Sequence, residues 1–183
     1  TTLLGAEFYV MAFAEGRILR GPADAAAMDA DRCRRAAESL IDVQVAMHTL
    51  DVDAVGLGDL GRRDAYVERQ LSRWLRQYEA VKSRELPLVK ALHARLSKAV
   101  PPQQRVGLVH GDYRFDNTVL GADDRVVAVL DWELATLGDP VADFCWSILY
   151  WSDPGEPHDF GSPSPTRHPS FPRRADAIET YAN

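Results

Sequence analysis

Three polar residues near the middle of the sequence have the types and spacing that a magnesium-dependent reaction requires. Asp112 follows the apolar stretch 106–110, Asn117 comes five residues later, and Asp131 ends the apolar run 126–130. Polar groups at the ends of buried strands, joined by a short loop and a hairpin, can converge on one cleft. Carboxylate and amide oxygens are ligands that Mg²⁺ prefers in proteins. The sequence therefore predicts a hard-oxygen site built from these three side chains.

The order of these residues also matches the parts that phosphoryl transfer needs. One carboxylate orients and deprotonates the attacking hydroxyl, while an Asn and a second Asp hold metal ions on the nucleotide phosphates. The pattern D-x-x-x-x-N followed by a strand-terminal Asp has the same residue order and spacing as the protein-kinase catalytic loop and its metal-binding Asp. A loop Asp, a turn Asn and a helix-capping Asp are the structural alternatives. The joint spacing favours the functional interpretation.

The elements that must position these residues are mainly helices. Apolar residues recur at helical spacing over 29–50, 64–83 and 87–100, and this spacing predicts a helix over each stretch. Two further helices are predicted over 139–151 and from about Arg174 to the end. The chain is therefore predicted to be mainly helical, with a small β element inserted late.

Short apolar runs predict the strands. They cover 7–13, 106–110, 118–120 and 126–130. The last two runs are separated by GADDR, a turn signal that predicts a β-hairpin. This hairpin lies between the predicted catalytic Asp and the strand-terminal Asp.

Several chemically capable side chains are predicted to be structural. Trp74 and Tyr78 lie on the apolar stripe of a helix, which favours a place in the core. Cys33 and Cys145 are far apart without metal-ligand spacing, which favours two buried thiols over a disulfide. The scattered histidines outside the central motif, His48 among them, are predicted to have no special role.

Composition limits the class of protein. The chain has 183 residues, 46% of them hydrophobic and 26% charged, which predicts one globular domain with a second small lobe as the alternative. The net charge of -6, without a basic block longer than two residues, argues against a nucleic-acid partner. No apolar run reaches the roughly 18 residues of a membrane span. Cysteine usage favours the cytoplasm. The sequence leaves the oligomeric state open.

Two segments carry a resemblance to a known family. HGDYRFDN (110–117) and VLDWELATLGDPVAD (129–143) resemble the aminoglycoside phosphotransferase/choline kinase family, and more narrowly the phosphotransferase domain that some proteins carry fused to an acyl-CoA dehydrogenase. The likeness extends through FYVMAFAEG, GLGDLGRR, QLSRWLRQYEA and SFPRRADAIETYA, and so covers essentially the whole chain. It implies an α+β, protein-kinase-like fold, here mainly the helical C-terminal lobe with a small β-hairpin and without the N-terminal lobe.

The resemblance implies roles for the residues of the central motif. Asp112 would be the catalytic base, and Arg114 a cation near the transferred phosphate. Asn117 and Asp131 would ligate Mg²⁺, with ATP as the phosphate donor.

The resemblance also implies supporting roles. His110 and Asp143 would brace the catalytic loop, with Asp143 hydrogen-bonding back to that loop from the following helix. Backbone groups of Ala12 and Ala14 would meet the adenine in the hinge between lobes. Many family members have Glu at the position of Ala12, but a backbone contact survives that change.

By the same resemblance the chain divides into two parts. Residues 1–16 would be the inter-lobe hinge strand and linker. Residues 17–183 would be the helical C-terminal lobe, truncated at its C-terminal end, with the catalytic loop and metal-binding segment at 106–133.

The phosphate-covering loop and the phosphate-binding Lys of kinase-like folds have no counterpart here. The three lysines, Lys82, Lys90 and Lys98, all lie on predicted helices. We therefore expect this chain alone to bind nucleotide weakly and to be inactive.

Three functions remain open at this point. The favoured one is an ATP-dependent small-molecule phosphotransferase that transfers the γ-phosphate to a substrate hydroxyl, with a hydroxyacyl compound as the narrower acceptor. The second is a non-catalytic nucleotide-binding domain with a kinase-like fold. The third is a metal-dependent phosphohydrolase built on His110, Asp112 and Asp131.

Overall fold

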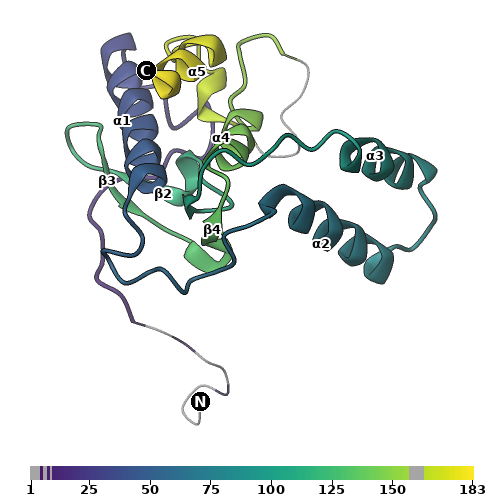
Figure 1. Cartoon of the computed structure of the whole chain (residues 1–183). Coiled ribbons are helices and arrows are strands. Elements are labelled where there is room, and N and C mark those ends of the chain that lie inside the picture. Colours follow the sequence, from purple (N-terminus) through teal and green to yellow (C-terminus); the bar gives the residue numbers. More distant parts are fainter. Residues whose placement is uncertain (1–4, 6–7, 9, 157–162) are drawn as a thin grey trace.

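The computed structural model describes residue 5, residue 8, residues 10–156 and residues 163–183. Figure 1 shows a body in which helices surround two short β-ladders, and a pair of helices that extends away from this body. The helices are α1 (Ala30–Thr49), α2 (Tyr66–Val81), α3 (Pro87–Ser97), α4 (Pro140–Leu149) and α5 (Arg174–Ala182). Each predicted helix is therefore present, with ends that differ by a few residues from the predicted ones.

Helix α1 is the main support of the body. The Asp29 side chain caps its first turn by accepting a hydrogen bond of 2.9 Å from the backbone N–H of Arg32. Its buried face carries residues at helical spacing, including Cys33, Leu40 and Met47. This face packs against α5 and against the strand that leads into the central motif. The amphipathic pattern that predicted the helix is thus the pattern that fixes it to the core.

The strands form two antiparallel pairs. Strand β2 (Thr118–Leu120) pairs with β3 (Val126–Val129), which confirms the predicted hairpin around residues 121–125. Strand β1 (Gly107–Val109) pairs with β4 (Thr136–Gly138), with Leu108 opposite Leu137. Strand β4 was not predicted, because three residues are too few to show an alternating apolar pattern.

The predicted strand at 7–13 is wrong where it can be checked. Residues 7 and 9 lie outside the described residues, and Phe8 and residues 10–13 form no strand. A strand needs a partner, and the first backbone pairing in the described part of the chain is at Arg17, which exchanges hydrogen bonds of 2.8 and 2.9 Å with Leu120. The apolar side chains of Phe8 and Phe13 are accordingly exposed.

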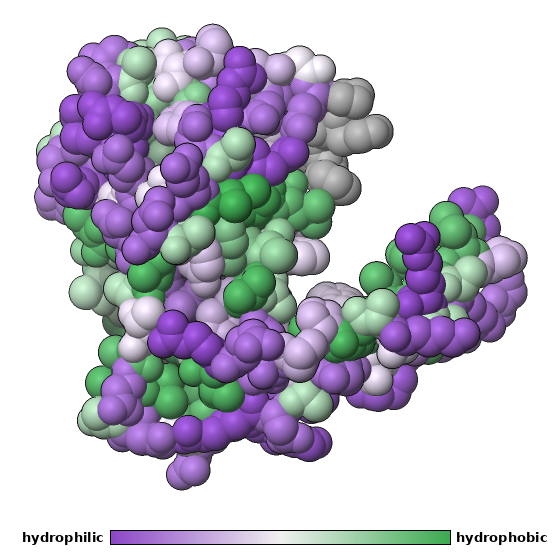
Figure 2. Space-filling view, turned by 45° about the horizontal axis from the view of Figure 1, so that its top comes forward, coloured by the Kyte–Doolittle hydropathy of each residue, from purple (hydrophilic) through white to green (hydrophobic). Residues whose placement is uncertain are grey.

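Helices α2 and α3, with their connection, form what we call the two-helix arm (residues 66–97). Figure 2 shows this arm standing away from the body, with a hollow between them. Trp74 and Tyr78 on the apolar stripe of α2 were predicted as core, but Tyr66 is the only buried residue of α2, and α3 has none. The two helices pack on each other rather than on the body, so one side of each stripe stays in solvent.

The structure corrects the predicted burial of Trp74 and Tyr78 on this stripe. Trp74 is 49% exposed, so its predicted place in the core is wrong. Tyr78 is half-buried, and its hydroxyl accepts a hydrogen bond of 2.8 Å from the backbone N–H of Leu86. Tyr78 thus fixes the turn between α2 and α3 rather than a central core.

The base of the arm is held by one side chain. The amide of Gln103 accepts a hydrogen bond of 3.1 Å from Tyr66 N–H, and donates bonds of 2.8 and 3.0 Å to the carbonyls of Arg63 and Arg105. The Tyr66 ring also packs against Gly138, where an added Cβ would lie 2.6 Å from ring carbons of Tyr66. The chain entering the arm and the chain leaving it are therefore joined at one point.

A buried carboxylate holds the β2–β3 hairpin against α1. Asp124, in the hairpin turn, is 2% exposed and forms ion pairs with Arg17, Arg32 and Arg35. The hydrogen bonds and charges of Arg32 and Arg17 hold the pKa of Asp124 well below its usual range, although its burial opposes ionisation. The hairpin that leads to Asp131 is thereby fixed relative to Arg17 and to α1.

The two thiols differ from each other. Cys33 is buried, as predicted, whereas Cys145 is exposed on α4, and both are free. Burial raises the pKa of Cys33 to about 11, which keeps it protonated and inert.

Within the described residues, no helix is both long enough and apolar enough to cross a membrane.

Candidate active site

The loop after β1 presents its side chains alternately to the core and to the surface. Tyr113 and Phe115 are buried, and the Tyr113 hydroxyl donates a hydrogen bond of 2.8 Å to the carbonyl of Leu40 on α1. Burial raises the pKa of Tyr113, so it stays a neutral donor. Because these two residues point inward, Asp112 and Arg114 point outward from the same short segment. Their side chains are 24% and 22% exposed.

The carboxylate of Asp112 is held from three sides. Trp146 donates its indole N–H to Oδ1 over 3.1 Å, and Asn117 donates its amide N–H to Oδ2 over 3.0 Å. The Arg114 Nε lies 3.4 Å from Oδ1. The 3-10 turn Phe115–Asn117 brings Asn117 back over the loop, where its amide nitrogen also bonds the carbonyl of Asp112 at 2.8 Å. Asp112 and Asn117, which were expected to converge on one cleft, are therefore in direct contact.

His110 is a structural part of this loop. It is fully buried, its Nδ1 accepts a hydrogen bond of 3.3 Å from the backbone N–H of Asp112, and its Nε2 donates one of 2.8 Å to the carbonyl of Leu130. Both ring nitrogens are used, which defines a neutral imidazole that carries its proton on Nε2. The ring thereby links the Asp112 loop to the end of β3.

Gly111 allows the loop to turn at this point. Its φ is +84°, and a Cβ there would meet the side chain of Leu134 at 2.9 Å. Both the backbone conformation and the close approach therefore require glycine.

Asp143 braces the loop from α4. Its Oδ1 accepts a hydrogen bond of 2.8 Å from Gly111 N–H, and its Oδ2 accepts one of 3.2 Å from His110 N–H. His48, which sequence analysis left without a role, lies with its Nε2 3.0 Å from the same Oδ2. Burial opposes ionisation of Asp143, but the hydrogen bonds from His48 and the two loop amides outweigh it and lower its pKa. A buried carboxylate thus holds the backbone beneath Asp112.

Asp131 lies next to Asn117 through the backbone. The N–H of Leu130 bonds the carbonyl of Asn117 at 2.9 Å, which places Asp131 one residue beyond this link. Asp131 has a φ of +63° and is exposed. A left-handed conformation is costly for a residue with a side chain, and such residues concentrate at functional sites.

The oxygens of Asn117 and Asp131 suit a magnesium ion. The Asn117 amide nitrogen is used by Asp112, so its amide oxygen is the atom available to a cation. The described residues contain no group of three His, Cys, Asp or Glu side chains that could enclose a metal. A cation here would therefore share its coordination with phosphate oxygens and water, as Mg²⁺ in nucleotide sites does.

The Asp112 carboxylate faces an open cleft between the body and the arm. The cleft has a volume of about 380 Å³, within the range of small-molecule sites. Its lining from the arm includes Tyr66, Gln70, Arg73 and Trp74, and its lining from the body includes Asp112, Arg114, Trp146 and Tyr150. Trp74, predicted as core, is therefore a cleft wall.

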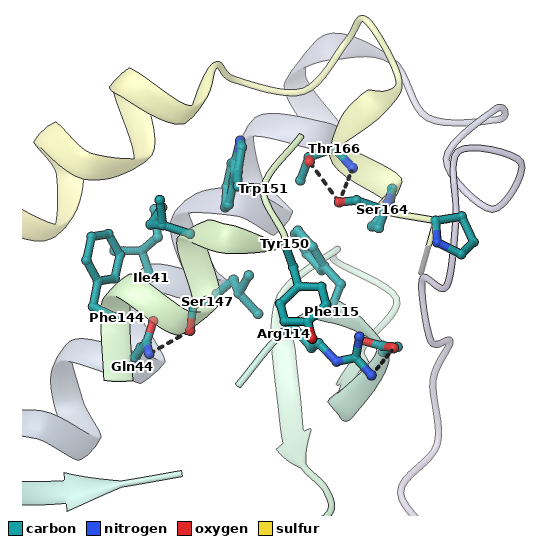
Figure 3. Close-up of a pocket in the computed structure, with 15 residues that line it drawn as sticks. Ile41, Gln44, Arg114, Phe115, Phe144, Ser147, Tyr150, Trp151, Ser164 and Thr166 are labelled. Carbon is teal, nitrogen blue, oxygen red and sulfur yellow. Dashed lines mark hydrogen bonds and ion pairs between the residues drawn. The ribbon is translucent and has the colours of Figure 1, made fainter. Parts of the chain in front are cut away.

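Arg114 lines both this cleft and a second, smaller pocket that is partly open to solvent. Its guanidinium lies 4.6 Å from the centre of the Tyr150 ring, and its Nη2 lies 3.0 Å from Oδ2 of Asp116. Figure 3 shows the cavity, with Arg114 and Tyr150 on one wall and the hydrogen-bonded pair Gln44 and Ser147 on another. Its volume of about 30 Å³ corresponds to roughly one water molecule. This cavity is too small for a substrate.

The residues predicted to form the hinge lie away from the cleft at Asp112. Ala12 is exposed and Ala14 is half-buried in the segment 10–15, and neither lines the cleft at Asp112. The structure therefore gathers Asp112, Arg114, Asn117, His110 and Asp143 in one place, with Asp131 adjacent, and leaves Ala12 and Ala14 apart. Their expected contact with adenine remains a prediction.

Comparison with known proteins gives this geometry a context. A sequence model described as the phosphotransferase enzyme family matches residues 1–161. Acyl-CoA dehydrogenase family member 11 of Gallus gallus is 35% identical over 179 residues, covering 93% of this chain and 23% of that protein. The chain thus spans about a quarter of this curated relative.

Solved structures have the same fold. A protein from Ralstonia eutropha assigned as an aminoglycoside phosphotransferase superposes with a TM-score of 0.79 at 32% identity, covering 92% of this chain and 52% of the other. The streptomycin–ATP ternary complex of APH(2'')-IIa superposes with a TM-score of 0.60 at 15% identity, covering 93% and 55%. The expected α+β, kinase-like fold is confirmed.

Proposed function

Because this chain belongs to the phosphotransferase enzyme family, we propose that it carries the catalytic loop of an ATP-dependent small-molecule kinase. The enzyme transfers the γ-phosphate to a hydroxyl of its acceptor. The observation that carries this proposal is the Asp112 carboxylate, which faces a cleft of about 380 Å³ while Asn117 is bonded to its other oxygen. A single carboxylate is thus shared between an acceptor cleft and a metal-binding side chain, as phosphoryl transfer requires.

The residues of the loop have separable tasks in this mechanism. Asp112 accepts a hydrogen bond from the acceptor hydroxyl and takes its proton as the new P–O bond forms. The bond between the γ-phosphorus and the β,γ-bridging oxygen breaks in the same step, and ADP is the leaving group. Trp146 and Asn117 fix the carboxylate in the orientation that this transfer needs. Arg114, held against Tyr150, offsets negative charge beside Asp112. Asn117 and Asp131 would hold Mg²⁺, which supplies charge neutralisation at the donor phosphates when bound.

The relatives support a narrower acceptor. The curated protein from Gallus gallus is named as an acyl-CoA dehydrogenase family member, and a hydroxyacyl compound would connect a kinase domain to that name. We therefore place hydroxyacyl compounds first among the acceptors, ahead of aminoglycosides and choline-like alcohols.

An ATP-consumption screen of the full-length protein tests this function. Hydroxyacyl-CoAs, aminoglycosides and choline-like alcohols are offered with Mg²⁺, and formation of the phosphorylated acceptor is followed by mass spectrometry. We expect one acceptor class to be phosphorylated and Asp112→Asn to abolish the reaction. Asp59→Asn, an exposed loop residue outside the cleft, is the matched control. Undiminished turnover by Asp112→Asn would remove the assignment of the base, and the absence of turnover with every acceptor would favour a non-catalytic nucleotide-binding domain.

The geometry does not favour a phosphohydrolase built on His110, Asp112 and Asp131. Both nitrogens of His110 are bonded inside the fold, so this ring has no lone pair for a metal. Phosphate-ester hydrolysis without ATP is accordingly expected to be absent from the same screen.

A further inference from the structure

Three arginines share one face of α2. Arg69, Arg73 and Arg76 occupy positions i, i+4 and i+7, which lie one above the other on a helix. Arg62 joins them from the preceding loop, where its carbonyl accepts a hydrogen bond of 2.8 Å from Nη2 of Arg69. We call these four residues the arginine patch. It lines a cavity of about 350 Å³ whose other wall is the segment 133–136.

The charges of the patch are not balanced within the described residues. Arg62 pairs with Asp64, and both are exposed. No carboxylate among the described residues forms an ion pair with Arg69, Arg73 or Arg76. The cavity wall contains a single acidic residue, Glu133.

This arrangement works against stability. Like charges four residues apart destabilise a helix. In addition, the Nη1 of Arg69 is buried and has no hydrogen-bond partner in the described part of the chain, and a buried donor without a partner is costly. The chain as a whole carries a net charge of -6, so the patch is a local exception. Within the described residues, neither the repulsion among these arginines nor the unpaired donor of Arg69 is offset. We infer that an anionic ligand binds at the patch.

The patch continues into the cleft at Asp112. Gln70, Arg73 and Leu134 line both the arginine cavity and the cleft. A ligand whose hydroxyl lies at Asp112 can therefore extend past Arg73 onto the patch without leaving the protein surface. The cleft that this ligand would cross is also lined by the aromatic side chains of Trp74 and Trp146.

We propose that the arginine patch is an anion-binding subsite for the acceptor, so that the acceptor is an alcohol bearing a phosphate or pyrophosphate group. The inference rests on the proposed function of the adjoining cleft. Guanidinium groups bind phosphoryl oxygens in pairs of parallel hydrogen bonds. A carboxylate can form such a pair of hydrogen bonds with only one guanidinium group. Several arginines in one cavity are better matched to a group with several charged oxygens, such as a phosphate or pyrophosphate. Polycationic acceptors would be repelled by the same cavity.

Direct binding of inorganic pyrophosphate tests the subsite. The titration uses the full-length protein, isothermal calorimetry and a buffer without divalent cations, so that binding at the donor site is minimised. The test variant is Arg73→Gln combined with Arg76→Gln, and the control is Arg95→Gln, an exposed arginine of α3 that lines neither cavity. We expect the double variant to weaken pyrophosphate binding at least about tenfold, since each hydrogen bond to a charged group contributes on the order of 1.5 kcal/mol or more. The control should bind as the unmodified protein does.

Kinetics separate this inference from the proposed function. The two acceptors are one alcohol with and without its phosphate group, and the double variant should raise KM for the phosphorylated form alone, with kcat little changed. Asp112→Asn should lose turnover and keep pyrophosphate binding. Equal pyrophosphate binding by the double variant and the unmodified protein overturns the subsite, even if turnover is intact. Retained, arginine-dependent pyrophosphate binding without phosphorylation of any acceptor overturns the kinase function and leaves the anion site.

Discussion

Nε2 of His48 lies 3.0 Å from Oδ2 of Asp143, and both side chains are buried beneath the loop that carries Asp112. The other nitrogen of His48 lies 2.7 Å from the Tyr181 hydroxyl. A polar chain therefore runs from α5 through α1 to the backbone N–H groups of Gly111 and His110. The position of Asp112, the proposed base, is thus coupled to the packing of α5 against α1.

This coupling predicts a pH-dependent loss of stability. The pKa of Asp143 is lower in the folded state than in the unfolded state, where it is about 3.9. Its contribution to the free energy of unfolding is therefore fully present above the unfolded-state pKa and is lost as the pH falls through the folded-state pKa. Asp143→Asn should reduce the free energy of unfolding by about 3 kcal/mol at pH 7, and the difference should shrink below about pH 4. Urea denaturation from pH 3 to pH 7 measures it. Asp42→Asn, exposed on α1, is the control; a difference that is constant with pH would contradict the linkage.

Trp146 is predicted to act through its indole N–H. Trp146→Phe keeps an aromatic cleft wall but removes the hydrogen bond of 3.1 Å to Oδ1 of Asp112. We expect kcat to fall about tenfold, because a hydrogen bond to a charged group contributes on the order of 1.5 kcal/mol, while KM changes little. Steady-state kinetics of the full-length protein make the measurement, with the exposed neighbour Cys145→Ser as control. A change in KM alone would indicate that Trp146 binds the acceptor and does not position the base.

The hairpin carboxylate is predicted to be important for stability. Asp124→Asn keeps a residue that tolerates the left-handed backbone there but removes the charge that pairs with three arginines. The free energy of unfolding should fall by about 2 kcal/mol, a value reduced for the partial exposure of the arginines. The loss is read from chemical denaturation beside Asp123→Asn, the exposed preceding residue. Equal stability of the two variants would show that solvent screens these ion pairs.

The arm is predicted to open as a unit when its base is released. Gln103→Ala removes three hydrogen bonds that join Tyr66, Arg63 and Arg105. Amide hydrogen exchange in α2 should accelerate by about tenfold or more, whereas exchange in α1 should not change. Gln104→Ala, whose amide bonds only the carbonyl of Pro102, is the comparison. Equal acceleration in α1 would mean that the variant had lowered global stability instead.

Local patterns predicted most of the fold. The helices carry clear 3.6-residue periodicity, and the hairpin carries a turn signal, so both could be found from neighbouring residues alone. The contact between Asp112 and Asn117 was predictable because both residues belong to one loop. The contacts of Trp146 with Asp112 and of His48 with Asp143 join residues 34 and 95 positions apart. No local pattern contains that information.

Burial on the arm was predicted incorrectly for a related reason. Periodicity identifies which face of a helix is apolar, but not what covers that face. Helices α2 and α3 cover each other, so Trp74 remains at the edge and becomes part of the cleft. The arginine patch was also missed, because its members are interleaved with the apolar stripe and are separated by other residues along the sequence.

The hydrogen bonds of Gln103 at the base of the two-helix arm have a consequence for how proteins with this fold diversify. The Gln103 side chain links positions 37 residues apart, so the intervening segment is joined at its base and faces the Asp112 loop across the cleft. If the proposed function holds, mutations accumulating in this segment would alter which compounds bind in the cleft and leave the hydrogen bonds that hold Asp112 in place. Natural selection could therefore explore new acceptors at little risk to the chemistry, and recombination that exchanges the arm between homologues would be a practical route to new specificities.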